Sequence, residues 1–227
     1  MATKRQSIKR LLAIVISSIV IVLVGILIGL KLYFNHKNTL AYNASLAKVA
    51  KQAKQLDSIY RQYSSLPTST TQSQSDWDSY YSGLISQVKA INSTTSTTYT
   101  QSALNKLNSD IETASESFIN LLNLDKSATD MQFQIQTDQN QVTTDKGLLQ
   151  TDIANDNSTC ALAATNPYIT CDRSLENQAS SYLTTANNQL STDQQTLKNQ
   201  QSQSATLDFT VAGQISTANI DSAKLLK

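Results

Sequence analysis

The most apolar stretch of the chain is Leu11–Leu30, which carries no charge and in which fifteen of twenty residues are Ile, Leu or Val. As a helix that rises about 1.5 Å per residue, it would cover roughly 30 Å, the thickness of the hydrocarbon core of a bilayer. Four basic residues precede it, which favours a cytoplasmic N-terminus. We therefore predict a single-pass cell-membrane anchor over residues 11–34, a cytoplasmic tail over 1–10 and an extracytoplasmic remainder.

A cleaved signal peptide fits this stretch less well. The apolar core of a signal peptide usually spans about 7–15 residues and is followed closely by small residues at the cleavage site. Here the longer run is followed by Lys31-Leu32-Tyr33-Phe34. The anchor is therefore expected to stay in the mature protein.

Beyond the anchor, apolar residues recur at alternating spacings of four and three, which is typical of helices that pack along one face. Glycine and proline are rare, with five and two residues in the chain. We predict an all-α fold in which residues 35–206 form an elongated helical bundle with an antiparallel coiled-coil hairpin. The expected helices cover 32–66, 76–91, 104–156 and 174–204, and whether 100–156 is one helix or two stays open.

Local signals refine the ends of these helices. Pro67 should end the first one, because proline lacks an amide donor and disfavours helix in the residue before it. Ser75 and Ser174 are candidate N-caps, and Ser127-x-x-Asp130 resembles a capping box that could restart a helix. The first apolar seam, Tyr42–Tyr63, fits either one helix of an intramolecular bundle or a parallel dimeric stalk.

The C-terminal segment, 207–227, has a different pattern. Leu207, Phe209 and Val211 alternate with polar residues, which indicates a short extended piece. Gly213 follows it. The rest is expected to form a short helix or to be disordered.

The hairpin seam over 131–156 is thin. Ile135, Val142 and Leu149 lie seven residues apart, and we place Gln139 and Lys146 at the paired positions. Thr-Asp recurs in the same interval. The three carboxylates would lie about 10 Å apart along a helix, too far to share one metal ion, so a solvated face is expected. These are Asp138, Asp145 and Asp152.

The two cysteines, Cys160 and Cys171, flank a turn at Asn166-Pro167. Outside the membrane they are expected to form a disulfide, worth about 3 kcal/mol through the restricted unfolded chain. No neighbouring residues complete a metal site, so none is predicted. The closed loop is either a staple or the end of the hairpin that contacts a partner.

Two further groups are candidate interaction residues. Ser18, Gly25 and Gly29 share one face of the anchor and could let two helices approach closely, which would make the protein a homo-oligomer. Trp77, Tyr80 and Tyr81 form either a platform for a ligand or partner or the aromatic end of the bundle core. Three Asn-x-Ser/Thr sequons begin at Asn43, Asn92 and Asn157.

Composition excludes several classes of function. Charged residues make up 15% of the chain, and the part beyond Lys31 has a net charge of −4, with thirteen basic and seventeen acidic residues. That part of the chain has no basic patch, so we do not expect it to bind nucleic acid. The single histidine, His36, lies beside the anchor, and no catalytic motif or phosphate-binding glycine loop occurs. We expect neither an enzyme nor a cofactor.

These observations favour a cell-envelope protein that acts in interaction or structure: a scaffold, an accessory subunit of a membrane complex or a surface-contact protein with an unknown protein partner. One alternative is a ligand-binding ectodomain, which resembles chemoreceptor sensor bundles in outline and would signal through a partner. A lesser alternative resembles a pilin-like filament subunit. However, Lys4-Arg5-Gln6 lacks the small residue expected before the pilin leader cut, and no Glu opens the apolar run.

Overall fold

The computed structural model describes residues 2–65, 72–95 and 101–226, with side chains over 28–32, 38–65, 72–91 and 101–226. The described residues form helices and contain no strand, so the all-α prediction is confirmed. In chain order the helices are α1 (Ala2–Ser64), α2 (Gln74–Thr95), α3 (Ser102–Ala163) and α4 (Ser174–Leu225).

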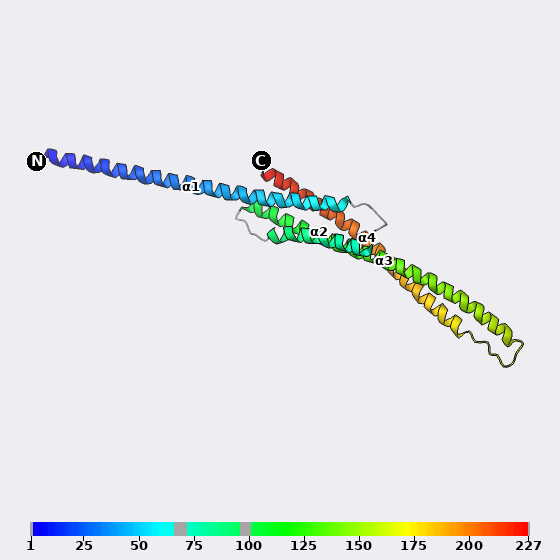
Figure 1. Ribbon diagram of the computed structural model, residues 1–227. Coiled ribbons are helices and arrows are strands. Elements are labelled where there is room, and N and C mark those ends of the chain that lie inside the picture. The colour runs from blue at the N-terminus through cyan, green and yellow to red at the C-terminus, as the bar shows by residue number, and fades with distance from the viewer. Residues whose placement is uncertain (1, 66–71, 96–100, 227) are drawn as a thin grey trace.

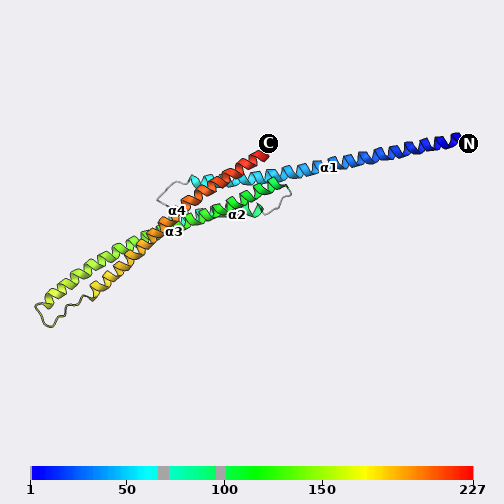
Figure 2. The same ribbon diagram turned by 180° about the vertical axis from the view of Figure 1, so that it is seen from behind.

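The molecule is elongated, with three zones along its length (Figure 1). The N-terminal part of α1 extends alone at one end. In the middle all four helices lie side by side, and we call this region, formed by the described residues of 46–130 and 200–225, the body. The second view shows α3 and α4 continuing together to the opposite end (Figure 2). We call this two-helix region, residues 131–199, the arm.

The body is held together by a continuous apolar core to which all four helices contribute. Leu56, Val88, Phe118 and Val211, one from each helix, have no exposed surface. Tyr60 and Tyr63 meet the ring of Phe118 edge-on, with centroids 5.5 and 5.6 Å away. The α1 seam thus packs inside the same chain, which is the first of the two arrangements predicted for it.

Helix α3 runs without a break through the position where a restart was expected. Ser127 and Asp130 do not cap a helix. Instead, Gln200 Nε2 donates to Ser127 Oγ at 2.9 Å and Gln74 Nε2 donates to Asp130 Oδ1 at 2.8 Å. The apparent capping box is therefore a set of polar contacts between helices, and 102–163 is one helix.

The C-terminal segment differs from the prediction, since α4 remains helical to Leu225 and includes no extended piece. Its buried positions explain why. Val211, Ile215, Ala218 and Ser222 follow a helical seam and close the body core, whereas Phe209 lies off that seam and is 84% exposed. Burial of the seam thus outweighs the short alternation of apolar and polar residues.

The N-caps also lie elsewhere than predicted. Ser73, not Ser75, caps α2: the Ser73 N–H donates to Asp76 Oδ2 at 3.0 Å and Asp76 N–H donates to Ser73 Oγ at 3.3 Å. At the start of α4, Ser174 is the first helical residue and its N–H donates to Asp172 Oδ1 at 2.9 Å. Hydrogen bonds from the Ser73 hydroxyl, at 2.7 Å, and from the Ser73 N–H lower the pKa of Asp76, and the bond from the Ser174 N–H lowers the pKa of Asp172.

Within the described residues, no helix combines the length and hydropathy needed to cross a membrane. Most of the predicted anchor, residues 11–27, lies outside the described side chains. The described apolar side chains of α1 between residues 28 and 40 are uncovered. Ile28, Leu30, Leu32 and Leu40 are between 48% and 64% exposed.

Candidate functional site

The arm has a mixed seam in which aspartates alternate with aliphatic residues. Asp145 is 7% exposed and Asp152 is half-buried, so this acidic row turns toward α4 and the predicted solvated face is wrong. The aspartates follow Ile135, Val142 and Leu149 by three residues each and so occupy the paired seam positions. Gln139 and Lys146, which were expected there, are exposed.

Polar partners stabilise two of the buried carboxylates of the seam. Gln141 Nε2 donates to Asp145 Oδ1 at 2.8 Å, and on α4 Gln189 Nε2 donates to Asp193 Oδ1 at 3.0 Å. These pairs lie four residues apart on the same helix, where side chains are neighbours. The arm therefore packs with much less apolar contact than the body.

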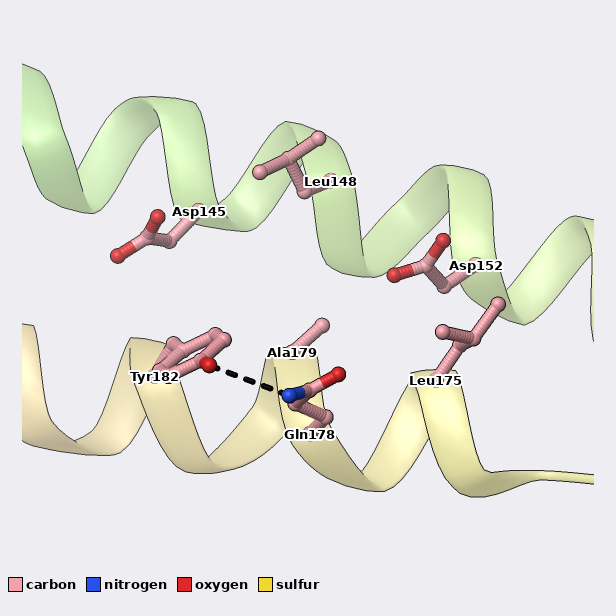
Figure 3. A pocket seen from close by; sticks show the side chains of 7 residues that line it. All are labelled: Asp145, Leu148, Asp152, Leu175, Gln178, Ala179 and Tyr182. Atoms are coloured by element: carbon pink, nitrogen blue, oxygen red, sulfur yellow. Dashed lines mark hydrogen bonds between the residues drawn. The ribbon is translucent and has the colours of Figure 1, made fainter.

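A groove opens between α3 and α4 near the outer end of the arm (Figure 3). It encloses a cavity of about 120 Å³, and its lining residues are Asp145, Leu148, Asp152, Leu175, Gln178, Ala179 and Tyr182. Ala179 is buried, and its small side chain leaves space opposite α3. Gln178 Nε2 donates to Tyr182 Oη at 3.2 Å, which fixes one side of the groove.

The rim of this groove is apolar and uncovered. Leu148 and Leu175 are each 55% exposed and Tyr182 is 59% exposed. Leu162 and Tyr168 extend the exposed apolar surface toward the tip. Grouped apolar side chains of this kind are a usual mark of an interaction surface.

The tip of the arm is closed by the predicted disulfide, Cys160–Cys171, whose Cα atoms are 4.4 Å apart. Tyr168 lies inside the closed loop and is 94% exposed. On the α4 side, Arg173 pairs with Glu176 at 3.2 Å. The bond therefore joins the outer end of α3 to the segment just before α4 while leaving the loop residues accessible.

The net negative charge of the residues beyond Lys31 is concentrated in the arm. Residues 131–199 contain seven acidic and three basic residues, a net charge of −4. The rest of the chain beyond Lys31 contains ten acidic and ten basic residues. The groove therefore lies in the negative part of the chain, and the other residues beyond Lys31 are balanced in charge.

The structure brings Trp77, Tyr80 and Tyr81 together at the end of the body nearest the arm. The Trp77 and Tyr81 rings stack with centroids 5.9 Å apart, and Tyr80 meets both edge-on. Tyr81 is buried in the core and the other two rings pack against it. Of the two predicted roles, this packing matches the aromatic end of the core.

Hydrogen bonds join α1, α3 and α4 at this same end of the body, where it meets the arm. Tyr63 Oη donates to Asp125 Oδ2 at 2.5 Å, and Tyr60 Oη donates to Asp208 Oδ1 at 2.7 Å. Burial, with the neighbouring carboxylates, raises the pKa of both tyrosines. Ser204 also donates to Asp125, so one carboxylate links α1, α3 and α4.

The remaining predicted residues are placed as follows. Gly29 lies on the uncovered part of α1, and a Cβ there would meet open space. The side chains of Ser18, Gly25, His36 and Asn92 lie outside the described ones. Asn43 and Asn157, the other two sequon residues, are exposed on helices.

Among the side chains described, no three His, Cys, Asp or Glu residues cluster so as to hold a metal ion. No family model, curated protein or solved structure matches the chain. The chemistry of the described surfaces is therefore the basis for assigning a function.

The groove residues Leu148, Leu175 and Tyr182 were not among the predicted site residues. A signal for two of them is present in the sequence, because Leu148 precedes the seam residue Leu149 and Tyr182 precedes Leu183. Adjacent residues lie about 100° apart around a helix, so where only two helices pack together the neighbour of a seam residue lies off their contact. In the two-helix arm, pairs of this kind therefore indicate apolar surface that the hairpin itself does not cover.

Proposed function

We propose that this protein is a non-enzymatic, membrane-anchored component of the cell envelope that presents the arm to a protein partner. Leu11–Leu30 would anchor α1 in the membrane, since this stretch is uncharged and of spanning length. The body would then lie outside the membrane, and the arm would extend away from it.

The placement of the predicted anchor and the arm at opposite ends of the molecule is the observation that supports this role (Figure 1). The α3 part of the arm, residues 131–163, is about 50 Å long at 1.5 Å per residue. The disulfide holds the outer end together and Tyr168 is exposed within its loop. This arrangement suits a surface held at a distance from the bilayer.

A ligand-binding sensor has less support. That role needs an apolar pocket at Trp77, Tyr80 and Tyr81, whereas Tyr81 is only 6% exposed and the other two rings pack against the core. The accessible aromatic and aliphatic side chains of the arm fit contact with a macromolecule better than enclosure of a small molecule.

Position-specific photo-crosslinking in living cells tests the proposal. The photoreactive residue p-benzoylphenylalanine replaces Tyr168 on the arm or, as a matched control, Phe209 on the body; these aromatic residues are 94% and 84% exposed. We expect the chain to stay in the membrane fraction after alkaline extraction and to crosslink to another protein from position 168 only. A soluble chain, or crosslinks from position 209 alone, would contradict the proposal.

A further inference from the structure

We infer that the groove between α3 and α4 of the arm docks a basic amphipathic helix of the partner protein. This inference rests on the proposed function and adds the chemistry of the partner. It begins with Leu148, Leu175 and Tyr182, which surround the buried Ala179 and are each more than half exposed (Figure 3).

A helix fits this groove because two packed helices leave a furrow along each side of their contact. A third helix that lays its apolar face into such a furrow completes a three-helix bundle and covers side chains that are otherwise wet. The small Ala179 side chain and the 120 Å³ cavity leave room for an inserted aliphatic residue. Leu148 and Leu175 would flank that residue.

Charge indicates that the docked helix is basic. Asp145 and Asp152 line the groove and lie seven residues apart on α3, about 10 Å along the helix axis. A helix with lysine or arginine at the same heptad spacing could place one cation beside each carboxylate. Docked charges of opposite sign speed association and fix the register of the complex.

The same charge disfavours the other occupants of the groove. A second copy would bring another arm with a net charge of −4 against the first, and like charges facing each other cost binding energy. An anionic membrane surface or polymer would be repelled for the same reason. Of these occupants, only a cationic helix gains binding energy both from the apolar rim and from the carboxylates.

The test uses the full chain in nanodiscs of zwitterionic lipid and a fluorescent synthetic peptide. The peptide carries leucine on one helix face and lysine at every seventh position beside it, and empty nanodiscs give the background. A second peptide has glutamate in place of each lysine. We expect the basic peptide to bind in a salt-sensitive manner and the acidic peptide not to bind.

Two pairs of variants locate the site. Leu148→Ser with Leu175→Ser should weaken binding of the basic peptide by about tenfold or more, because two apolar contacts are lost. The matched control is Phe209→Ser with Ile220→Ser, which removes exposed apolar residues from the body and should leave binding unchanged. Circular dichroism checks that the variant chains remain helical.

The charge contribution has its own variant. Asp145→Asn with Asp152→Asn keeps the shape of the groove, and the amide oxygen introduced at the first position can still accept from Gln141. This variant should flatten the salt dependence of binding, because the two carboxylate charges are gone. The inference is overturned if the acidic peptide binds as well as the basic one. Equal binding by the serine variants, or crosslinking between two copies from p-benzoylphenylalanine at Tyr182, also overturns it.

The two proposals fail in different ways. Absence of peptide binding, together with cellular crosslinks from position 168, rejects the basic helix and leaves the presenting arm. Absence of arm crosslinks in cells rejects the proposed function itself, whatever the peptide does in nanodiscs.

Discussion

The body and the arm share two helices but are stabilised differently. In the body, the α3 seam residues Leu104, Ile111 and Phe118 are fully buried among four helices. In the arm, the same helix alternates Val142 and Leu149 with aspartates, and among the described helices α4 alone packs against it (Figure 1). The body is therefore built for stability, whereas the arm leaves apolar and acidic surface uncovered.

This difference shows how the number of packed helices affects which residues a heptad seam can contain. With four helices, the seam residues are enclosed and most of them are apolar, because a buried polar group without a partner costs free energy; Ser222 is one of the few polar residues buried there. With two helices, the flanks of the seam stay near water, so aspartates at paired positions can be partly solvated or hydrogen-bonded. Ser, Thr, Asn and Gln then suffice along most of the arm.

The largest expected effect comes from a core residue of the body. Phe118→Ala should lower the free energy of unfolding by about 3–5 kcal/mol, because it removes a buried ring and leaves a cavity. Chemical denaturation followed by circular dichroism measures it. Leu148→Ala on the arm, 55% exposed, should cost less than about 0.5 kcal/mol. Similar losses for the two variants would contradict the division between body and arm.

Next in size is the disulfide at the tip of the arm. Replacing both cysteines by serine should destabilise the folded chain by about 3 kcal/mol, since the bond restricts the unfolded loop. The effect should be local. Hydrogen exchange should quicken near Ala163 and Ser174 and stay slow at Phe118. Uniformly faster exchange throughout α3 would show that the arm and the body unfold as one unit.

Sequence patterns predicted the helices, the disulfide and the body core, because each depends on a repeated or local signal. The heptads of α1 and α3 identify Leu56 and Phe118 as core, and the pairing of the cysteines was expected from their spacing and the predicted compartment. The sequence did not predict that Asp145 turns toward α4, since hydropathy ranks aspartate as solvent-facing. Which face a helix buries depends on its neighbour, and that neighbour is distant in sequence.

The C-terminal segment shows the same limit. Leu207, Phe209 and Val211 alternate, but three residues are too few to distinguish a strand from a helix. The longer series Val211, Ile215 and Ala218 has helical spacing and is buried in the body. Tertiary burial therefore decides the structure, and Phe209 is left exposed.

An intermediate effect is expected where the body meets the arm. Tyr63→Phe removes the hydroxyl that donates to Asp125 and should cost about 1–2 kcal/mol at neutral pH. The pKa of Tyr63 is raised on folding, so its contribution is full below the unfolded value of about 10 and is lost as pH rises further.

The pH dependence gives this prediction its control. Between pH 10 and 11 the wild type should lose more stability than Tyr63→Phe, because only the wild type must keep this hydroxyl protonated in the folded state. Denaturation curves at stepped pH measure the difference. Parallel loss in the two proteins would mean that Tyr63 is not the group responsible.

The smallest effect should have the opposite sign and lies in the arm. Asp156 is 6% exposed, and its Oδ2 atom is buried without a hydrogen-bond partner among the described residues. Asp156→Leu removes this desolvated oxygen and adds apolar contact in the seam, so the arm should gain about 0.5–1 kcal/mol. Asn155→Leu, one position away and exposed, should be near neutral. Slower hydrogen exchange at the outer end of α3 in Asp156→Leu alone is the expected result. Destabilisation by Asp156→Leu would instead mean that the aspartates stabilise the seam, and that the arm, like the body, is optimised for its own packing.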